Sequence, residues 1–137
     1  MIEKIIIDTN VIARALLKDN ATQTKQSVEL LKRIEANEVI GILTSEVIAE
    51  LFFVMGSEKL YGLSKEQITS LLRVIINLKS IETTATKQTI LLAFDICVNE
   101  NLAIVDSLLV AKSLKEGIEL RTYDKRMLKV LEKLKAV

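Results

Sequence analysis

Short apolar runs of β-branched residues alternate with helix-forming segments along this chain, and this alternation limits the possible folds more than any other feature. The run Lys4-Ile5-Ile6-Ile7 is continuous and apolar after its lysine, as buried parallel strands are. Strands separated by helices favour an α/β domain with a mostly parallel sheet and helices on both faces. The expected strands are 4–7, 39–43, 80–83 and 118–122, and the expected helices are 11–17, 22–36, about 45–55, 64–76, 86–99, 104–116 and 125–134.

Local signals fix some of the helix ends. Ser64 and Gln67 form a capping box, and Gly117 stands where a helix C-terminal cap is expected. The 137 residues, half of them hydrophobic, fit one domain over residues 1–137. No apolar run reaches the roughly 20 residues that span a bilayer, and the start of the chain carries no leader-like pattern. We therefore expect a cytoplasmic protein without a membrane segment.

Histidine is absent and Cys97 is the one cysteine, which removes several kinds of chemistry. A Ser-His-Asp triad, a histidine-based ribonuclease mechanism, histidine-ligated zinc and an internal disulfide are all excluded. Cys97 lies in an apolar stretch and is expected to be a small buried hydrophobe. Hydrolytic chemistry must then come from carboxylates, lysine, hydroxyls or a metal ion held by oxygen atoms.

Two aspartates follow expected strands. Asp8 comes directly after the strand at 4–7, and Asp124 lies two residues after the strand at 118–122. Ligands of parallel α/β sheets bind outside the carboxyl ends of the strands, so both residues are candidates for a site. Aspartate is also a favoured N-cap, and a helix follows each of them. Capping is the better interpretation of either residue alone, whereas the two together on one rim indicate a site.

Two more acids interrupt apolar runs. Glu50 lies within residues 47–55, where a buried lone carboxylate is costly unless it is paired or bound to a cation. Glu46, one turn earlier on the same helix face, adds repulsion. The alternative is that this face meets water, which the surrounding apolar residues disfavour. For Asp106 the alternative is a helix that begins at Ser107 with Asp106 as its N-cap, and this alternative is a serious one.

Four converging carboxylates repel one another at neutral pH unless some are protonated or a cation neutralises them. Ligand sets made only of oxygen suit Mg²⁺ or Mn²⁺ rather than zinc. Such a cation lowers the pKa of bound water and polarises a phosphodiester. The residues therefore allow phosphodiester hydrolysis without a histidine base.

The acids lie in four motifs that resemble those of PIN-domain ribonucleases, over about residues 3–130. The motifs are Ile5–Val11, Ser45–Leu51, Val105–Lys112 and Leu120–Arg126, in the family's order and spacing. The resemblance implies a three-layer α/β/α PIN-like domain with a central, mostly parallel four- or five-stranded sheet. Many members add a strand after the fourth motif, but here residues 127–137 have the pattern of a basic helix.

The resemblance also implies roles for the site residues. Asp8, Glu50 and Asp106 would be the main metal ligands and catalytic residues, and Asp124 would support them or bind a second metal. For the polar residues Thr9, Asn10 and Thr122, the resemblance implies hydrogen bonds that orient the metal ligands and water. Glu46, one turn before Glu50, is placed in the same supporting group.

PIN-domain ribonucleases cleave RNA, and many small ones are VapC-like toxins that form homodimers and bind a small antitoxin protein. The resemblance implies these partners here. Four cations near the acidic rim in sequence are candidate RNA contacts, although ordinary surface charge explains them equally well: Arg14, Lys18, Lys125 and Arg126. With only five aromatic residues, phosphate contacts should outweigh base stacking.

Other interpretations explain part of the pattern. A phosphotransfer receiver domain would have paired acids after the first strand, and a haloacid-type phosphatase would have two aspartates around the first turn. Asp8-Thr9-Asn10 supplies one acid, so both rank low. A non-catalytic PIN-type module for RNA binding or assembly, and an RNA-processing nuclease without an antitoxin, remain open alternatives.

Overall fold

The structure is a computed structural model that describes residues 2–18 and 21–136. It contains two compact units, Met1–Ala85 and Thr86–Val137, and each is described by itself. The single domain expected over residues 1–137 stays a prediction. None of the helices among the described residues is long and apolar enough to cross a membrane.

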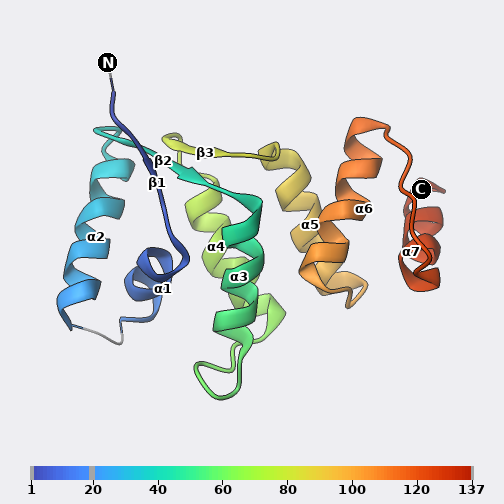
Figure 1. The fold of residues 1–137 in the computed structure, drawn as a ribbon, viewed down its shortest axis with the longest axis horizontal. Helices are drawn as coiled ribbons and strands as arrows, with labels where there is room; N and C mark the ends of the chain where they lie inside the picture. The colour runs from blue at the N-terminus through green and yellow to red at the C-terminus, as the bar shows by residue number, and fades with distance from the viewer. Residues whose placement is uncertain (1, 19–20, 137) are drawn as a thin grey trace. The chain divides into compact units, whose positions relative to one another are not determined.

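The first unit contains a parallel sheet of three strands in the order β1-β2-β3 (Figure 1). Its strands are β1 (Lys4–Ile6), β2 (Ile40–Leu43) and β3 (Ile81–Thr83). Because all three run in the same direction, the segments that follow them leave the sheet at one edge. This edge carries the starts of the helices after β1 and β2, and with them the first two acidic motifs.

Four helices accompany this sheet. The first packs against the second and the third, and the fourth packs against the third and against β3. Thr44 begins the third helix by accepting a 3.2 Å hydrogen bond from the Val47 N–H, and the capping box of Ser64 and Gln67 is confirmed at the fourth. The four are α1 (Thr9–Leu17), α2 (Ala21–Glu35), α3 (Ser45–Gly56) and α4 (Lys65–Ile76).

Gly41 lets the central strand pack closely against its neighbours. A Cβ atom at this position would lie 2.6 Å from Cδ1 of Ile7 and 2.8 Å from Cδ1 of Ile34, too close for any side chain without movement of both isoleucines. Ile7 and Ile34 are fully buried. The sheet of the first unit is therefore closely packed around Gly41, which holds the central strand in place.

The second unit is helical. It consists of α5 (Lys87–Asn99), α6 (Ile104–Glu116) and α7 (Lys125–Lys135), and α6 packs against both other helices. Gly117 ends α6 with φ of 66°, which confirms the expected glycine cap. The core is a cluster of buried apolar side chains, namely Ala93, Ile96, Leu102, Val110, Ala111, Met127, Val130 and Leu131.

The strand expected at 118–122 does not form, so the described sheet has three strands and not four or five. This segment is largely exposed, with Ile118 at 53%. Its apolar residues alternate with charged ones, unlike the continuous apolar run of a buried parallel strand. The Ile118 carbonyl instead accepts a 2.5 Å hydrogen bond from the Ser113 hydroxyl, which ties the segment to α6.

Of two smaller expectations, one is wrong and the other is confirmed over the described residues. β1 was expected to be fully buried, but Ile6 is 72% exposed, because its side chain points to the opposite face of the sheet from those of Ile5 and Ile7. The basic helix expected over 127–137 is confirmed as far as Lys135, and Val137 lies outside the described residues. The α/β class and the parallel sheet are confirmed, in an arrangement consistent with three α/β/α layers.

Candidate active site

Asp8 lies at the sheet edge where β1 gives way to α1. It occupies the N-cap position of α1, with φ of −78° and ψ of 158°, yet its side chain makes no capping hydrogen bond. The residue is exposed, and among the described residues its carboxylate has no hydrogen-bond or ion-pair partner. The capping role expected for Asp8 alone is therefore wrong, and its oxygens remain available to a ligand.

A hydrogen bond joins the residue after Asp8 to the second acidic motif. The hydroxyl of Thr9, 2% exposed, donates to Oε2 of Glu50 at 2.9 Å. Thr9 is the first residue of α1, and Glu50 lies in the middle of α3. The bond holds the Glu50 carboxylate beside the start of α1, which follows Asp8 directly, and orients it.

Glu50 is exposed, so the expectation that it is buried was wrong. Residues 47–55 are apolar, but α3 turns Ile48, Leu51 and Met55 into the core while Glu50 and Phe53 face outward. A helix with so many apolar residues still has one face toward water, as Phe53 at 78% exposure shows.

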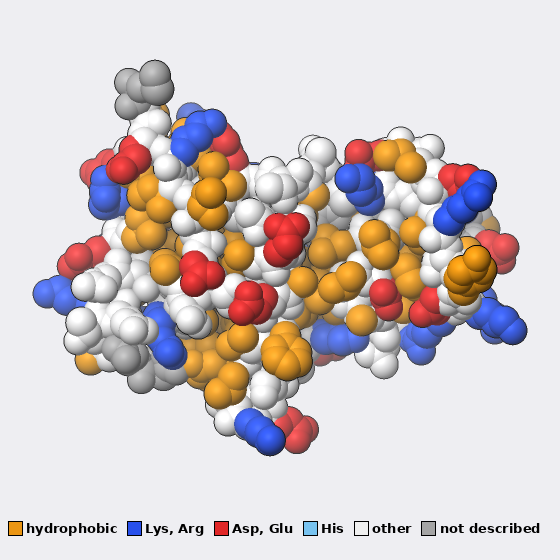
Figure 2. Space-filling model, in the orientation of Figure 1, with side chains coloured by type: hydrophobic (Ala, Val, Ile, Leu, Met, Phe, Trp, Pro, Cys, Tyr) orange, Lys and Arg blue, Asp and Glu red, His pale blue; other side chains and the backbone are white. Residues whose placement is uncertain are grey.

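Acidic side chains gather on this face of the first unit. Figure 2 shows them over the end of β1 and over α3. Glu46 lies one turn before Glu50 on α3 and is also exposed. Like charges placed together in this way favour binding of a cation. Within the described residues, however, no group of three or more acidic side chains is close enough to hold one metal ion together.

Asp106 belongs to the second unit and lies in the first turn of α6. Its helix begins at Ile104 with Ala103 as the N-cap, so the alternative in which Asp106 caps a helix starting at Ser107 is wrong. Ser107 is buried and donates a 3.3 Å hydrogen bond to the Leu102 carbonyl, which fixes this turn. Asp106 is half-buried, and its carboxylate has no partner among the described residues.

Asp124 has a structural role in the second unit. Its Oδ1 accepts hydrogen bonds from the backbone N–H groups of Arg126 at 2.9 Å and Met127 at 3.1 Å, and thereby caps α7. Thr122 accepts from the Asp124 N–H at 3.0 Å and so orders the turn before the helix. Oδ2 of Asp124 is left outside the cap, so capping and ligand binding are compatible.

The four candidate RNA contacts differ in how they are held. Arg14 donates to Oε1 of Gln23 at 2.8 Å and to the Tyr61 hydroxyl at 3.2 Å. Arg126 donates to the backbone carbonyls of Glu100 at 2.5 Å and Asn101 at 3.2 Å, which anchors α7 to the end of α5. The lysines are exposed: Lys18 is the C-cap of α1, and Lys125 is the first residue of α7.

The donor atoms suit a hard divalent cation. Asp8, Glu46 and Glu50 offer only carboxylate oxygens, the ligands that Mg²⁺ and Mn²⁺ prefer. Asn10, exposed at the second position of α1, adds an amide oxygen nearby in sequence. The sequence interpretation missed Tyr61 and Gln23, which hold Arg14, because their contacts join segments that no local pattern connects.

A model of the PIN domain family matches residues 5–133, nearly the whole chain. No curated protein and no solved structure matches the chain.

Proposed function

We propose that this chain, which belongs to the PIN domain family, is an endoribonuclease that depends on Mg²⁺ or Mn²⁺. The family is one of nucleases that act on RNA, typically with divalent metals, and a hydrolase activity follows from membership. The cofactor, the residues that carry the reaction and the biological role are parts of the proposal.

One observation carries the assignment of the site. The hydroxyl of Thr9, the residue directly after Asp8, donates a hydrogen bond to Glu50. The Asp8 carboxylate itself has no hydrogen-bond or ion-pair partner among the described residues. Exposed acids are ordinary at a protein surface, but an N-cap aspartate that does not cap its helix is unusual. We assign Asp8 and Glu50 as metal ligands, and we propose Asp106 and Asp124, in the third and fourth acidic motifs, as further catalytic residues that bind metal.

The chemistry at such carboxylates divides between the cation and the chain. When held by these carboxylates, Mg²⁺ or Mn²⁺ would supply Lewis-acid chemistry, which activates water and stabilises the leaving oxygen of a phosphodiester. Thr9 orients the Glu50 carboxylate, a positioning role. The backbone N–H groups at the start of α1 would donate hydrogen bonds that orient water and phosphate oxygens.

The finer biological role extends the proposal. A chain of this size is proposed to act as the toxin of a toxin–antitoxin pair, as a homodimer in the cytoplasm, with a small antitoxin protein as partner. These four features are implied by the resemblance to VapC-like proteins and remain predictions.

A cleavage assay tests the proposed function. End-labelled single-stranded RNA is incubated with the full chain in Mg²⁺ or Mn²⁺, with and without EDTA, and the products are resolved on a gel. We expect internal cleavage that EDTA abolishes and that Asp8→Asn and Asp106→Asn each strongly reduce. Glu58→Gln is the matched control, because Glu58 is an exposed acid without a partner among the described residues.

A non-catalytic RNA-binding module is the second candidate. It is favoured by the finding that no group of three acids in the described part of the chain is positioned to hold one metal. RNA binding without cleavage in either metal would select this candidate. Cleavage that persists in Asp8→Asn and Asp106→Asn would overturn the assigned site.

A further inference from the structure

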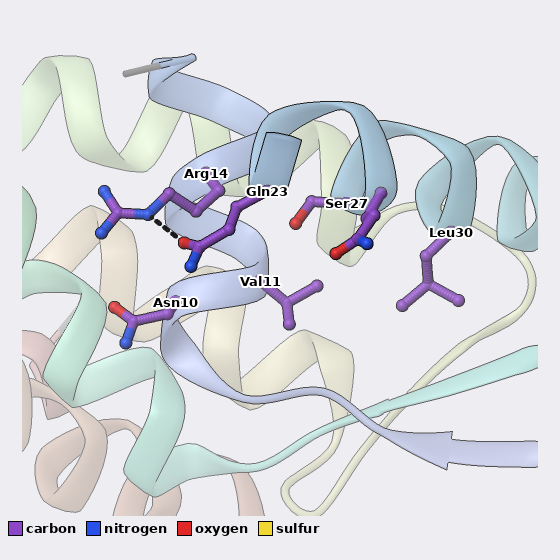
Figure 3. A pocket seen from close by; sticks show the side chains of 7 residues that line it. Asn10, Val11, Arg14, Gln23, Ser27 and Leu30 are labelled. Carbon is purple, nitrogen blue, oxygen red and sulfur yellow. Dashed lines mark hydrogen bonds between the residues drawn. The ribbon is translucent and has the colours of Figure 1, made fainter. Parts of the chain in front are cut away.

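A groove of about 390 Å³ lies between α1 and α2 in the first unit (Figure 3). Its volume falls in the range of roughly 300–1,000 Å³ that is usual for small-ligand sites. The polar lining comes from Asn10 and Arg14 on α1 and from Gln23, Gln26 and Ser27 on α2. Val11 and Leu30 add an apolar wall, and none of the described residues that line the groove carries a carboxylate.

Several of these polar side chains have unused hydrogen-bonding capacity. The amides of Asn10 and Gln26 and the hydroxyl of Ser27 have no hydrogen-bond partner within residues 2–18 and 21–136. Ser27 is 6% exposed as a residue and contributes its hydroxyl to the lining of the groove. Each amide offers both donors and an acceptor, and the hydroxyl offers one donor and acceptor sites.

One side of the groove is already ordered. Nε of Arg14 donates to Oε1 of Gln23 at 2.8 Å, and its Nη1 donates to the Tyr61 hydroxyl at 3.2 Å. The backbone carbonyl of Arg14 also accepts from the Thr24 hydroxyl at 3.1 Å, which joins α1 to α2 directly. The groove is therefore bounded by fixed groups, which lowers the ordering cost of binding a ligand.

The groove and the candidate active site share helix α1. Asn10 lies two residues after Asp8, and Arg14 lies one turn after Asn10 on the same helix face. At a rise of about 1.5 Å per residue, Asp8 to Arg14 covers roughly 9 Å of helix axis. That length is comparable to one or two nucleotides of an extended strand.

We propose that the groove between α1 and α2 binds a nucleobase of the RNA strand beside the scissile phosphate, with Gln26 and Asn10 reading its edge. This inference rests on the proposed function and adds to it a determinant of base preference. Single-stranded RNA is recognised by hydrogen bonds to exposed base edges, and asparagine and glutamine supply the paired donors and acceptors that such edges need.

The lining favours a base over the other parts of a nucleotide. Arg14, the one cation that lines the groove, is already bonded to Gln23 and Tyr61 within the described chain, so a phosphate would find few charged donors. Val11 and Leu30 match the apolar faces of a planar base, while the amides match its polar edge. A peptide would also place carbonyls near these amides, and the absence of any shift with the four nucleotides in the first test would favour it over a base.

The first test observes the groove directly. The full chain is titrated with AMP, GMP, CMP and UMP in EDTA, and side-chain amide resonances are followed by NMR. We expect at least one nucleotide to shift the amides of Gln26 and Asn10 and to do so more than the other three. Ribose 5-phosphate, which lacks a base, is the control and should leave them in place. Equal shifts with ribose 5-phosphate, or no shift with any nucleotide, would overturn the proposal.

The second test uses cleavage sites. A randomised RNA is cleaved to low conversion, and the bases flanking each cut are counted by sequencing. We expect Gln26→Leu to lose the wild-type preference at one flanking position by roughly tenfold, the discrimination that one bidentate base contact provides. Gln88→Leu makes the same replacement at an exposed position on α5 and should keep the preference.

The two tests separate the failure of this inference from the failure of the proposed function. Metal-dependent cleavage with an identical base profile in wild type and Gln26→Leu would overturn the inference and leave the nuclease assignment intact. If the chain cleaves no RNA in either metal, the proposed function fails, and the nucleotide titration still decides whether the groove binds a base.

Discussion

Asp8 and Asp124 occupy equivalent places in the two units, and the structure uses them in opposite ways. Each is the N-cap residue of a helix, and both have extended backbones, with φ of −78° and −77°. Asp124 accepts two backbone N–H bonds from α7, whereas Asp8 accepts none from α1. The position of an aspartate before a helix therefore predicts the backbone conformation but leaves the use of the carboxylate open.

The surroundings of the two residues explain what each is suited to do. Asp124 stabilises the start of a helix with no other N-terminal acid, and its carboxylate stays within its own turn. Asp8 is followed by Thr9, whose hydroxyl is directed across to α3 and Glu50. The first arrangement mainly supports folding, and the second leaves oxygens for a cation. Four substitutions break or sharpen this contrast, in order of decreasing effect.

Asp8→Asn should lower metal-dependent RNA cleavage by about 100-fold or more, since loss of a metal ligand removes several kcal/mol of transition-state stabilisation. Because Asp8 caps nothing, the free energy of unfolding should change by less than about 0.5 kcal/mol. Initial cleavage rates and urea denaturation measure the two quantities. A large loss of stability with unchanged cleavage would reverse the roles assigned to Asp8 and Asp124.

Thr9→Val should lower cleavage by about tenfold, since loss of an orienting hydrogen bond to a metal ligand usually costs between 10- and 100-fold. It should also cost about 1 kcal/mol of stability, because a part-buried hydrogen bond is lost. Thr9→Ser keeps the hydroxyl and should retain most of the activity in the same assay. Equal activity of the valine and serine variants would show that the bond to Glu50 has no positioning role.

Asp124→Ala should destabilise the chain by about 1 kcal/mol, through loss of the two capping hydrogen bonds. Asp124→Asn preserves an acceptor oxygen and should remain close to wild type in denaturant melts. Comparing cleavage by Asp124→Asn with cleavage by the wild type, at a temperature where both are folded, isolates the negative charge. If asparagine is as destabilising as alanine, the carboxylate contributes to stability in some way other than capping.

Arg126→Ala should have the smallest effect on RNA, because its guanidinium is bonded to the carbonyls of Glu100 and Asn101. We expect a loss of about 0.5–1.5 kcal/mol of stability and little change in RNA affinity at constant salt. Lys125→Ala, next to it and without such bonds among the described residues, is the control. A drop in affinity for Arg126→Ala alone, with stability unchanged, would restore it as an RNA contact.

Local patterns in the sequence predict most of this structure. The capping box at Ser64 and the glycine end of α6 depend on residues within one or two turns, so they were predictable. The order of strands and helices followed from the period of apolar residues. The acids Asp8 and Glu50 were also identified, although the argument that Glu50 is buried was wrong.

What could not be predicted depends on contacts between distant segments. Ile118–Thr122 has the composition of a strand, but strand formation needs a backbone partner that the segment itself does not encode. Which face of α3 is exposed depends on how that helix packs against its neighbours. The groove between α1 and α2 depends on the distance between the two helices, which no residue pattern in the sequence predicts.

The most direct test of the account is to locate a bound Mn²⁺, because the central claim is that Asp8 and Glu50 hold a divalent cation together. Backbone NMR of the full chain with substoichiometric Mn²⁺ measures which resonances broaden first. The account predicts broadening centred on residues 8–10 and on Glu50, lost in Asp8→Asn and kept in Glu58→Gln. Broadening elsewhere, or an unchanged pattern in Asp8→Asn, would contradict it.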